Sequence, residues 1–146
     1  MIGGKRRTAF QSILVGYDGS QQAEKAAEAA ISLANALDAK LTIVAVARPP
    51  EPAVSVELEA MLDNAREHFE HDFMRLAERA RRCELGIETE ILVGHPAEQI
   101  IHKAETMKAD LVVLGHRGTS MFHKWIMGSI SEKVLKHAHC PVMVVR

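Results

Sequence analysis

Short apolar runs alternate with longer segments of helical periodicity along this chain, and this alternation constrains its fold more than any other feature. The apolar runs cover residues 12–17, 41–47, 87–93, 111–114 and 142–145, and apolar residues recur every three or four positions over 21–37, 57–83, 97–107 and 129–137. Strands that are linked through helices run parallel with right-handed crossovers, and the helices then cover both faces of the sheet. The sequence therefore predicts an α/β fold of three layers, with a doubly wound, parallel, five-stranded sheet in the order 3-2-1-4-5.

The length of 146 residues fits one domain, which we place at residues 12–146 behind a flexible basic tail at 1–11. The start of the chain lacks the apolar segment of a signal peptide, and no run approaches the roughly 18 apolar residues that span a membrane. Cys83 and Cys140 lie far apart and form no CxxC pair, so a reducing, cytoplasmic compartment is expected. A net charge of −1 does not favour a nucleic-acid partner.

The strand order also predicts where a ligand binds. In a doubly wound sheet, ligands lie outside the carboxyl ends of the strands at the point where the order reverses. That point falls between the first and fourth strands, so the loops that begin at Gly16 and Gly115 should face each other across one crevice. Asp18 follows the first strand and has two interpretations, which one residue can combine. It caps the next helix or shapes the turn, with Gln21 completing a capping box, or its carboxylate accepts hydrogen bonds from a nucleotide.

A glycine-bounded segment links the fourth strand to the last helix. Gly115 and Gly118 follow the strand, and Gly128 and Ser129 stand where the helical pattern begins. Glycine lets the backbone approach an anion closely, and the first N–H groups of a helix have no partner within it. A serine hydroxyl there can cap the helix or contact a phosphate. The spacing favours a phosphate cradle over glycines that serve turn geometry alone, and the apolar insert at 121–127 is expected to anchor the loop to the core or to a second subunit.

Glycine, two residues, glycine, nine residues, and glycine followed by serine or threonine is the pattern of the ATP-binding branch of the universal stress proteins, and this chain resembles that family. The likeness covers nearly the whole chain after residue 11, including the segments 13–20, 94–97 and 141–145. The resemblance implies a Rossmann-like fold of the adenine nucleotide alpha hydrolase type. It also implies that Gly16 and Asp18 lie beside adenine and ribose and that the backbone of Val46 contacts adenine. The main-chain groups that would follow the ribose and phosphates belong to Gly115, Arg117, Gly118, Gly128, Ser129 and Ile130.

The expected function is that of an ATP-binding stress-response or regulatory protein, with AMP or ADP as further ligands and Mg²⁺ carried by the phosphates. The chain has no G-x-x-x-x-G-K-[ST] loop and no visible nucleophile–base pair. We therefore assign no catalytic residue and expect at most slow ATP hydrolysis or autophosphorylation. Two alternatives stay open: a nucleotide-free dimeric interaction protein, and an enzyme that acts on an adenylated substrate.

Two further expectations concern partners and metals. The terminal segment Val142–Val145 is apolar throughout and would otherwise form an exposed sheet edge, which predicts a homodimer through this strand. Members of the family that the chain resembles often pair in this way. His68 and His71, and likewise His137 and His139 beside Cys140, have no fourth ligand at zinc spacing, so we assign no metal to protein side chains.

Overall fold

The computed structural model describes residues 10–49, 55–116 and 128–146 of the chain. The strands are β1 (Ser12–Gly16), β2 (Lys40–Ala47), β3 (Ile87–Val93), β4 (Leu111–Gly115) and β5 (Val142–Val145), and the helices are α1 (Gln21–Leu37), α2 (Ser55–Arg81), α3 (Pro96–Thr106) and α4 (Ser129–His137). Each predicted element is present, with ends within two residues of the predicted ones. All but the last two residues of the predicted basic tail lie outside the described residues, as do Arg117, Gly118 and the apolar insert at 121–127.

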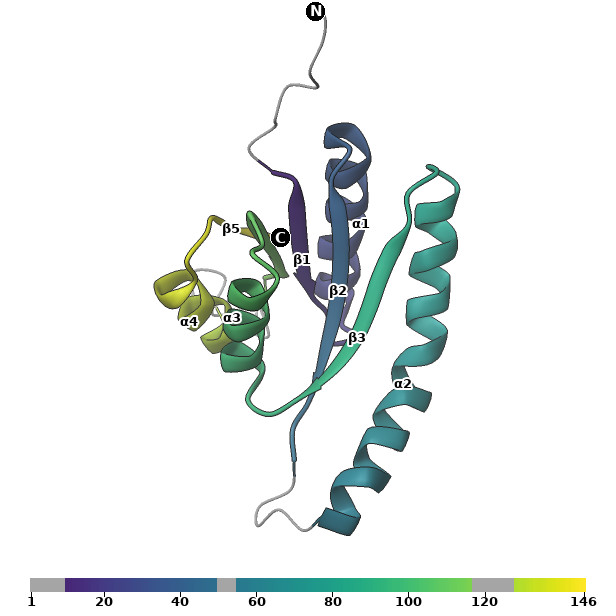
Figure 1. Ribbon diagram of the computed structural model, residues 1–146, viewed down its shortest axis with the longest axis vertical. Helices are drawn as coiled ribbons and strands as arrows, with labels where there is room; N and C mark the ends of the chain where they lie inside the picture. Colours follow the sequence, from purple (N-terminus) through teal and green to yellow (C-terminus); the bar gives the residue numbers. More distant parts are fainter. Residues whose placement is uncertain (1–9, 50–54, 117–127) are drawn as a thin grey trace, which may run out of the picture.

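The five strands form one parallel sheet in the order β3-β2-β1-β4-β5, which confirms the predicted topology (Figure 1). β1 lies at the centre, where Ile13 is paired with Leu41 of β2 and with Leu111 of β4. All three side chains are buried, because helices cover both faces of the sheet. Because β1 is central, the order in which the strands are added along the chain reverses beside it, between β1 and β4.

Two hydrophobic clusters fill the space between the sheet and its helices. α1 and α2 pack on one face, where Ile13, Ala30 and Leu76 belong to the same cluster. α3 and α4 pack on the other face, where Leu14 and Ile100 belong to the second cluster. Neighbours in β1 thus point to opposite clusters, as the two-residue period of a strand requires. Over the residues that the structure describes, no helix is both long and apolar enough to cross a membrane.

The first turn of α1 lies unusually close to the end of β4. The buried face of α1 consists mostly of alanine, whose small side chain allows a close approach to the sheet: Ala23, Ala26, Ala27, Ala30 and Ala34. A Cβ atom on Gly115 would lie only 2.5 Å from the carbonyl carbon and oxygen of Gln22. Backbone atoms cannot rotate away as a side chain can, so glycine is needed here to pack the helix on the strand, whether or not a ligand also approaches it.

Gly115→Ala should therefore destabilise the fold, because the added Cβ pushes the first turn of α1 away from β4. We expect the free energy of unfolding to fall by about 1–3 kcal/mol, as for other overpacked sites. Urea denaturation followed by circular dichroism would measure it. Gly86→Ala is the matched control, because a Cβ at Gly86 meets no atom within 4 Å. Equal stability of the two variants would contradict the close packing of α1 on β4.

Candidate functional site

A crevice of about 330 Å³ opens at the carboxyl ends of β1, β2 and β4, where the strand order reverses. Several of the predicted site residues, although far apart in the sequence, line it together: Gly16, Asp18, Val46, Gly115, Gly128 and Ile130. Gly16 and Gly115, the residues at which the two loops begin, therefore line one site, as the topology predicted. The remaining predicted residues are Arg117 and Gly118, which the structure does not describe, and Ser129.

The start of α4 differs from the prediction in one detail. Gly128 is the N-cap residue, with φ of −60° and ψ of 150°, and Ser129 is the first residue of the helix. The interpretation of Ser129 as the cap is therefore wrong. Glycine is accepted as an N-cap because that position needs an extended backbone rather than a helical one. Ser129 is not among the residues that line the crevice, so its contact with a ligand stays a prediction.

In the turn between β1 and α1, Asp18 shapes the turn and does not cap the helix. The Oδ1 atom of Asp18 accepts a hydrogen bond of 2.9 Å from the backbone N–H of Ser20, which shapes the turn. Ser20 caps α1, because its Oγ accepts a hydrogen bond of 3.1 Å from the N–H of Ala23. The capping box of Asp18 and Gln21 is thus wrong. The left-handed backbone of Gly19, with φ of +82°, moves the start of the helix beyond Asp18.

Sequence reasoning missed four polar residues that line the crevice: Tyr17, Ser20, Arg48 and Ser131. Arg48 is exposed and follows β2 directly; among the described lining residues it alone carries a full positive charge. The rule that pointed to Asp18, a position at the carboxyl end of a strand beside the reversal, could have identified Arg48 as well. Ser131 is buried, and its hydroxyl donates to the carbonyl oxygen of Gly115 at 3.5 Å. That contact between α4 and β4 has no signal in the local sequence.

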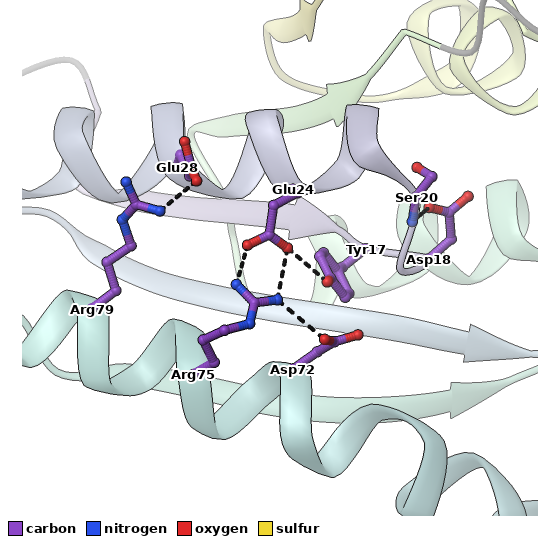
Figure 2. A network of polar contacts seen from close by, with 8 residues as sticks. All are labelled: Tyr17, Asp18, Ser20, Glu24, Glu28, Asp72, Arg75 and Arg79. Carbon is purple, nitrogen blue, oxygen red and sulfur yellow. Dashed lines mark hydrogen bonds and ion pairs between the residues drawn. The ribbon is translucent and has the colours of Figure 1, made fainter.

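Tyr17 forms part of the crevice wall, yet only 4% of its surface is exposed. Its hydroxyl donates a hydrogen bond of 2.8 Å to Oε2 of Glu24, and Arg75 of α2 pairs with the same carboxylate (Figure 2). Burial, and after it the hydrogen bond to Glu24, raises the pKa of the tyrosine hydroxyl. The hydrogen bond from Arg75 lowers the pKa of the Glu24 carboxyl. At neutral pH, Tyr17 therefore stays protonated and Glu24 stays ionised.

The crevice combines an apolar floor with polar groups around its rim. Val44, Ile100 and Leu114 form part of the floor, and Asp18, Arg48 and the first turn of α4 lie around it. The first N–H groups of a helix have no partner within that helix and attract negative charge. Such a site suits a flat ring system joined to a polar, negatively charged group. Among the described residues, no group of three or more His, Cys, Asp or Glu side chains could hold a metal ion.

Ser20→Ala should weaken the fold at the edge of the crevice, because the N–H of Ala23 loses its capping oxygen. Loss of an N-cap serine lowers the free energy of unfolding by about 0.5–2 kcal/mol. Ser32→Ala is the control, because Ser32 lies exposed within the same helix and alanine is the better helix former there. Thermal unfolding of both variants would check it, and a Ser20→Ala variant as stable as Ser32→Ala would rule out a stabilising cap.

Comparison with known proteins gives one consistent result. Residues 9–146 match the Universal stress protein family. A universal stress protein of Methanocaldococcus jannaschii is 33% identical over 141 residues, which cover 94% of this chain and 82% of the relative. The structure of the universal stress protein UspA from Lactobacillus plantarum has a TM-score of 0.84 at 28% identity and covers 96% of this chain and 100% of its own. A universal stress protein in complex with cAMP has a TM-score of 0.76 at 26% identity, over 95% of this chain and 99% of its own.

Proposed function

This chain belongs to the universal stress protein family, and from that premise we propose that its crevice binds an adenine nucleotide, ATP in particular, as part of a stress-response or regulatory function. The observation that carries the proposal is the meeting of Asp18, Val46, Gly115 and Gly128 in one crevice at the reversal of the sheet. The structural neighbour in complex with cAMP supports an adenine nucleotide as the class of ligand.

The lining residues suggest how such a ligand would be held. The apolar floor would take the adenine ring, with the backbone of Val46 beside it. The carboxylate of Asp18 would accept hydrogen bonds from the ribose hydroxyls. The phosphates would lie toward Gly128 and the first turn of α4, where helix N–H groups and the helix dipole favour negative charge. Mg²⁺ would be held through the phosphates, whose charge it neutralises in part.

Several polar side chains around the crevice already form hydrogen bonds within the protein, which fits a site that binds a nucleotide without turning it over. The hydroxyl of Ser131 donates to Gly115 and that of Tyr17 donates to Glu24, while Ser20 accepts from Ala23. A nucleophile needs a base that takes up its proton, and burial beside Glu24 makes deprotonation of Tyr17 harder rather than easier. We therefore propose a nucleotide-binding protein with slow hydrolysis or autophosphorylation at most.

Calorimetric titration of the purified protein, stripped of nucleotide, with ATP and Mg²⁺ tests the proposal, with GTP as the control ligand. We expect a dissociation constant on the order of micromolar, which corresponds to about −8 kcal/mol, and weaker binding of GTP. AMP, ADP and cAMP should be titrated in the same series, because their affinities relative to ATP show how much the phosphate groups contribute to binding. A folded, stripped protein that binds none of them would contradict the proposal and favour the nucleotide-free interaction protein. ATP turnover above a trace rate would favour an enzyme that acts on an adenylated substrate.

Gly128→Val is the variant to include in that titration. Valine can adopt the extended backbone of this N-cap position, so the fold should persist, but its branched side chain would keep phosphates away from the first turn of α4. Gly86→Val is the control, since Gly86 stands in open space before β3. We expect ATP affinity to be lost in the first variant and kept in the second. Normal binding by folded Gly128→Val would contradict the placement of the phosphates.

We also infer that two copies of the chain pair through β5, which lies at one edge of the sheet (Figure 1). Among the described strands, β4 alone pairs with β5, so its outer edge is open. Apolar side chains are exposed nearby: Met143 of β5 is 39% exposed, and Leu135 of α4 is 41% exposed. An apolar edge strand is a template for pairing with another chain, and natural proteins cover or pair it.

Met143→Lys should convert a dimer into a monomer, because it places a charge within the paired edge. Light scattering after size exclusion would measure the mass of the particle. Met74→Lys is the matched control: Met74 is 65% exposed on α2, which packs on β2 and β3 at the other end of the sheet from β5. A monomeric wild-type protein would contradict the pairing, and dissociation caused by Met74→Lys alone would move the interface to α2.

A further inference from the structure

A network of charged and aromatic side chains connects the crevice to α2. The Tyr17 hydroxyl donates to Glu24, and both carboxylate oxygens of Glu24 are engaged by the guanidinium of Arg75, one of them at 3.0 Å (Figure 2). The same guanidinium donates to Oδ1 of Asp72 at 3.1 Å. Arg75 thus lies between two carboxylates and fixes the one that receives the tyrosine hydrogen bond.

The ring of Tyr17 is held by α2 as well. It packs edge-on against Phe69, with ring centroids 6.3 Å apart, and at a tilt against Phe73 at 6.2 Å. α2 also reaches the turn after β1, because a Cβ built on Gly19 would come within 3.8 Å of Asp72 and 4.0 Å of Phe69. One side of the Tyr17–Ser20 turn therefore rests on α2, although no described residue that lines the crevice comes from this helix.

The protonation states of the network keep its direction of donation fixed. Glu24 faces Tyr17, which directly follows β1, and Arg75 on α2, with Asp72 and Arg79 nearby on the same helix. The hydrogen bond from Arg75 is the largest cause that lowers the pKa of Glu24, and burial is the largest cause that raises the pKa of Tyr17. Glu24 can therefore accept from both partners while Tyr17 only donates, and removal of Arg75 would leave a partly buried carboxylate with one partner fewer.

We propose that Arg75 is a positioning residue for nucleotide binding: through Glu24 it holds Tyr17, and through Tyr17 it holds the turn that presents Asp18 to the crevice. The proposal rests on the proposed function and adds α2 as an element that sets nucleotide affinity without touching the ligand. A second ion pair, with a single hydrogen bond, serves as an internal comparison. Arg79 pairs with Glu28 between the same two helices, one turn further along each, and no contact joins this pair to Tyr17 in the described network (Figure 2).

The first test compares Arg75→Gln with Arg79→Gln. Both variants remove an exposed guanidinium and one ion pair between α1 and α2. Arg75→Gln also removes the pair with Asp72 within α2, but an exposed pair of this kind contributes little to stability, so a purely structural contribution should affect the two variants nearly alike. We expect Arg75→Gln to weaken ATP binding roughly tenfold, as for the loss of a charge-assisted contact that holds a binding turn. Arg79→Gln should leave the dissociation constant unchanged, and Arg75→Lys should restore part of the affinity. Equal affinities of Arg75→Gln and Arg79→Gln would overturn the proposal.

The second test asks whether Arg75 acts through the tyrosine hydroxyl. In a Tyr17→Phe background the hydrogen bond to Glu24 is absent, so Arg75→Gln should cause little further loss of affinity, and the double-mutant cycle should show coupling. Additive losses would overturn the assigned route. Hydrogen exchange at the backbone amides of 18–20 needs no ligand: it should accelerate in Arg75→Gln and not in Arg79→Gln. If the wild type bound no nucleotide, the proposed function would fail, whereas the exchange comparison would still decide whether Arg75 positions the turn.

Discussion

The close contact between the first turn of α1 and the end of β4 is the constraint on which the candidate site depends. Gly115 has no side chain, so the backbone of Gln22 and Ala23 can lie directly against it. The turn that precedes α1 is thereby held beside the end of β4, and Asp18 and Ser20 line the same crevice as Gly128. The crevice is therefore a consequence of how a helix packs on a strand, and its shape and the stability of the fold depend on the same glycine.

The elements and the order of the strands could be predicted because both follow from patterns within short segments. Apolar runs and helical periodicity mark the elements, and the handedness of the crossovers leaves few topologies. The strand order alone placed Gly16, Asp18 and Gly115 around one crevice, whereas Val46 and Ile130 were assigned through the family resemblance. The prediction thus succeeded where a local pattern or a topological rule was sufficient.

The features that sequence reasoning missed depend on tertiary contacts, or on which of two suitable neighbouring residues takes a local role. Asp18 and Ser20 are both good capping residues, and the left-handed backbone of Gly19 decides between them. Arg75 meets Glu24 across 51 residues of sequence, and helical periodicity shows which residues of α2 are apolar but not which partner a charged one finds. Ser131 lines the crevice because of its place beside the carbonyl group of Gly115, which is a tertiary contact.

Tyr17 belongs to both the hydrophobic core and the crevice, so it links the position of α2 to the wall of the crevice. A residue that is 4% exposed takes its position from its neighbours, here Phe69, Phe73 and, through Glu24, Arg75. A shift of α2 must therefore move part of the crevice wall, and by thermodynamic reciprocity a ligand that fixes the wall must bias the position of α2. A protein that reports nucleotide occupancy to a partner needs such a link between its binding site and an outer surface. α2 reaches the outside of the protein, where Met74, on the same helix as Arg75, is largely exposed.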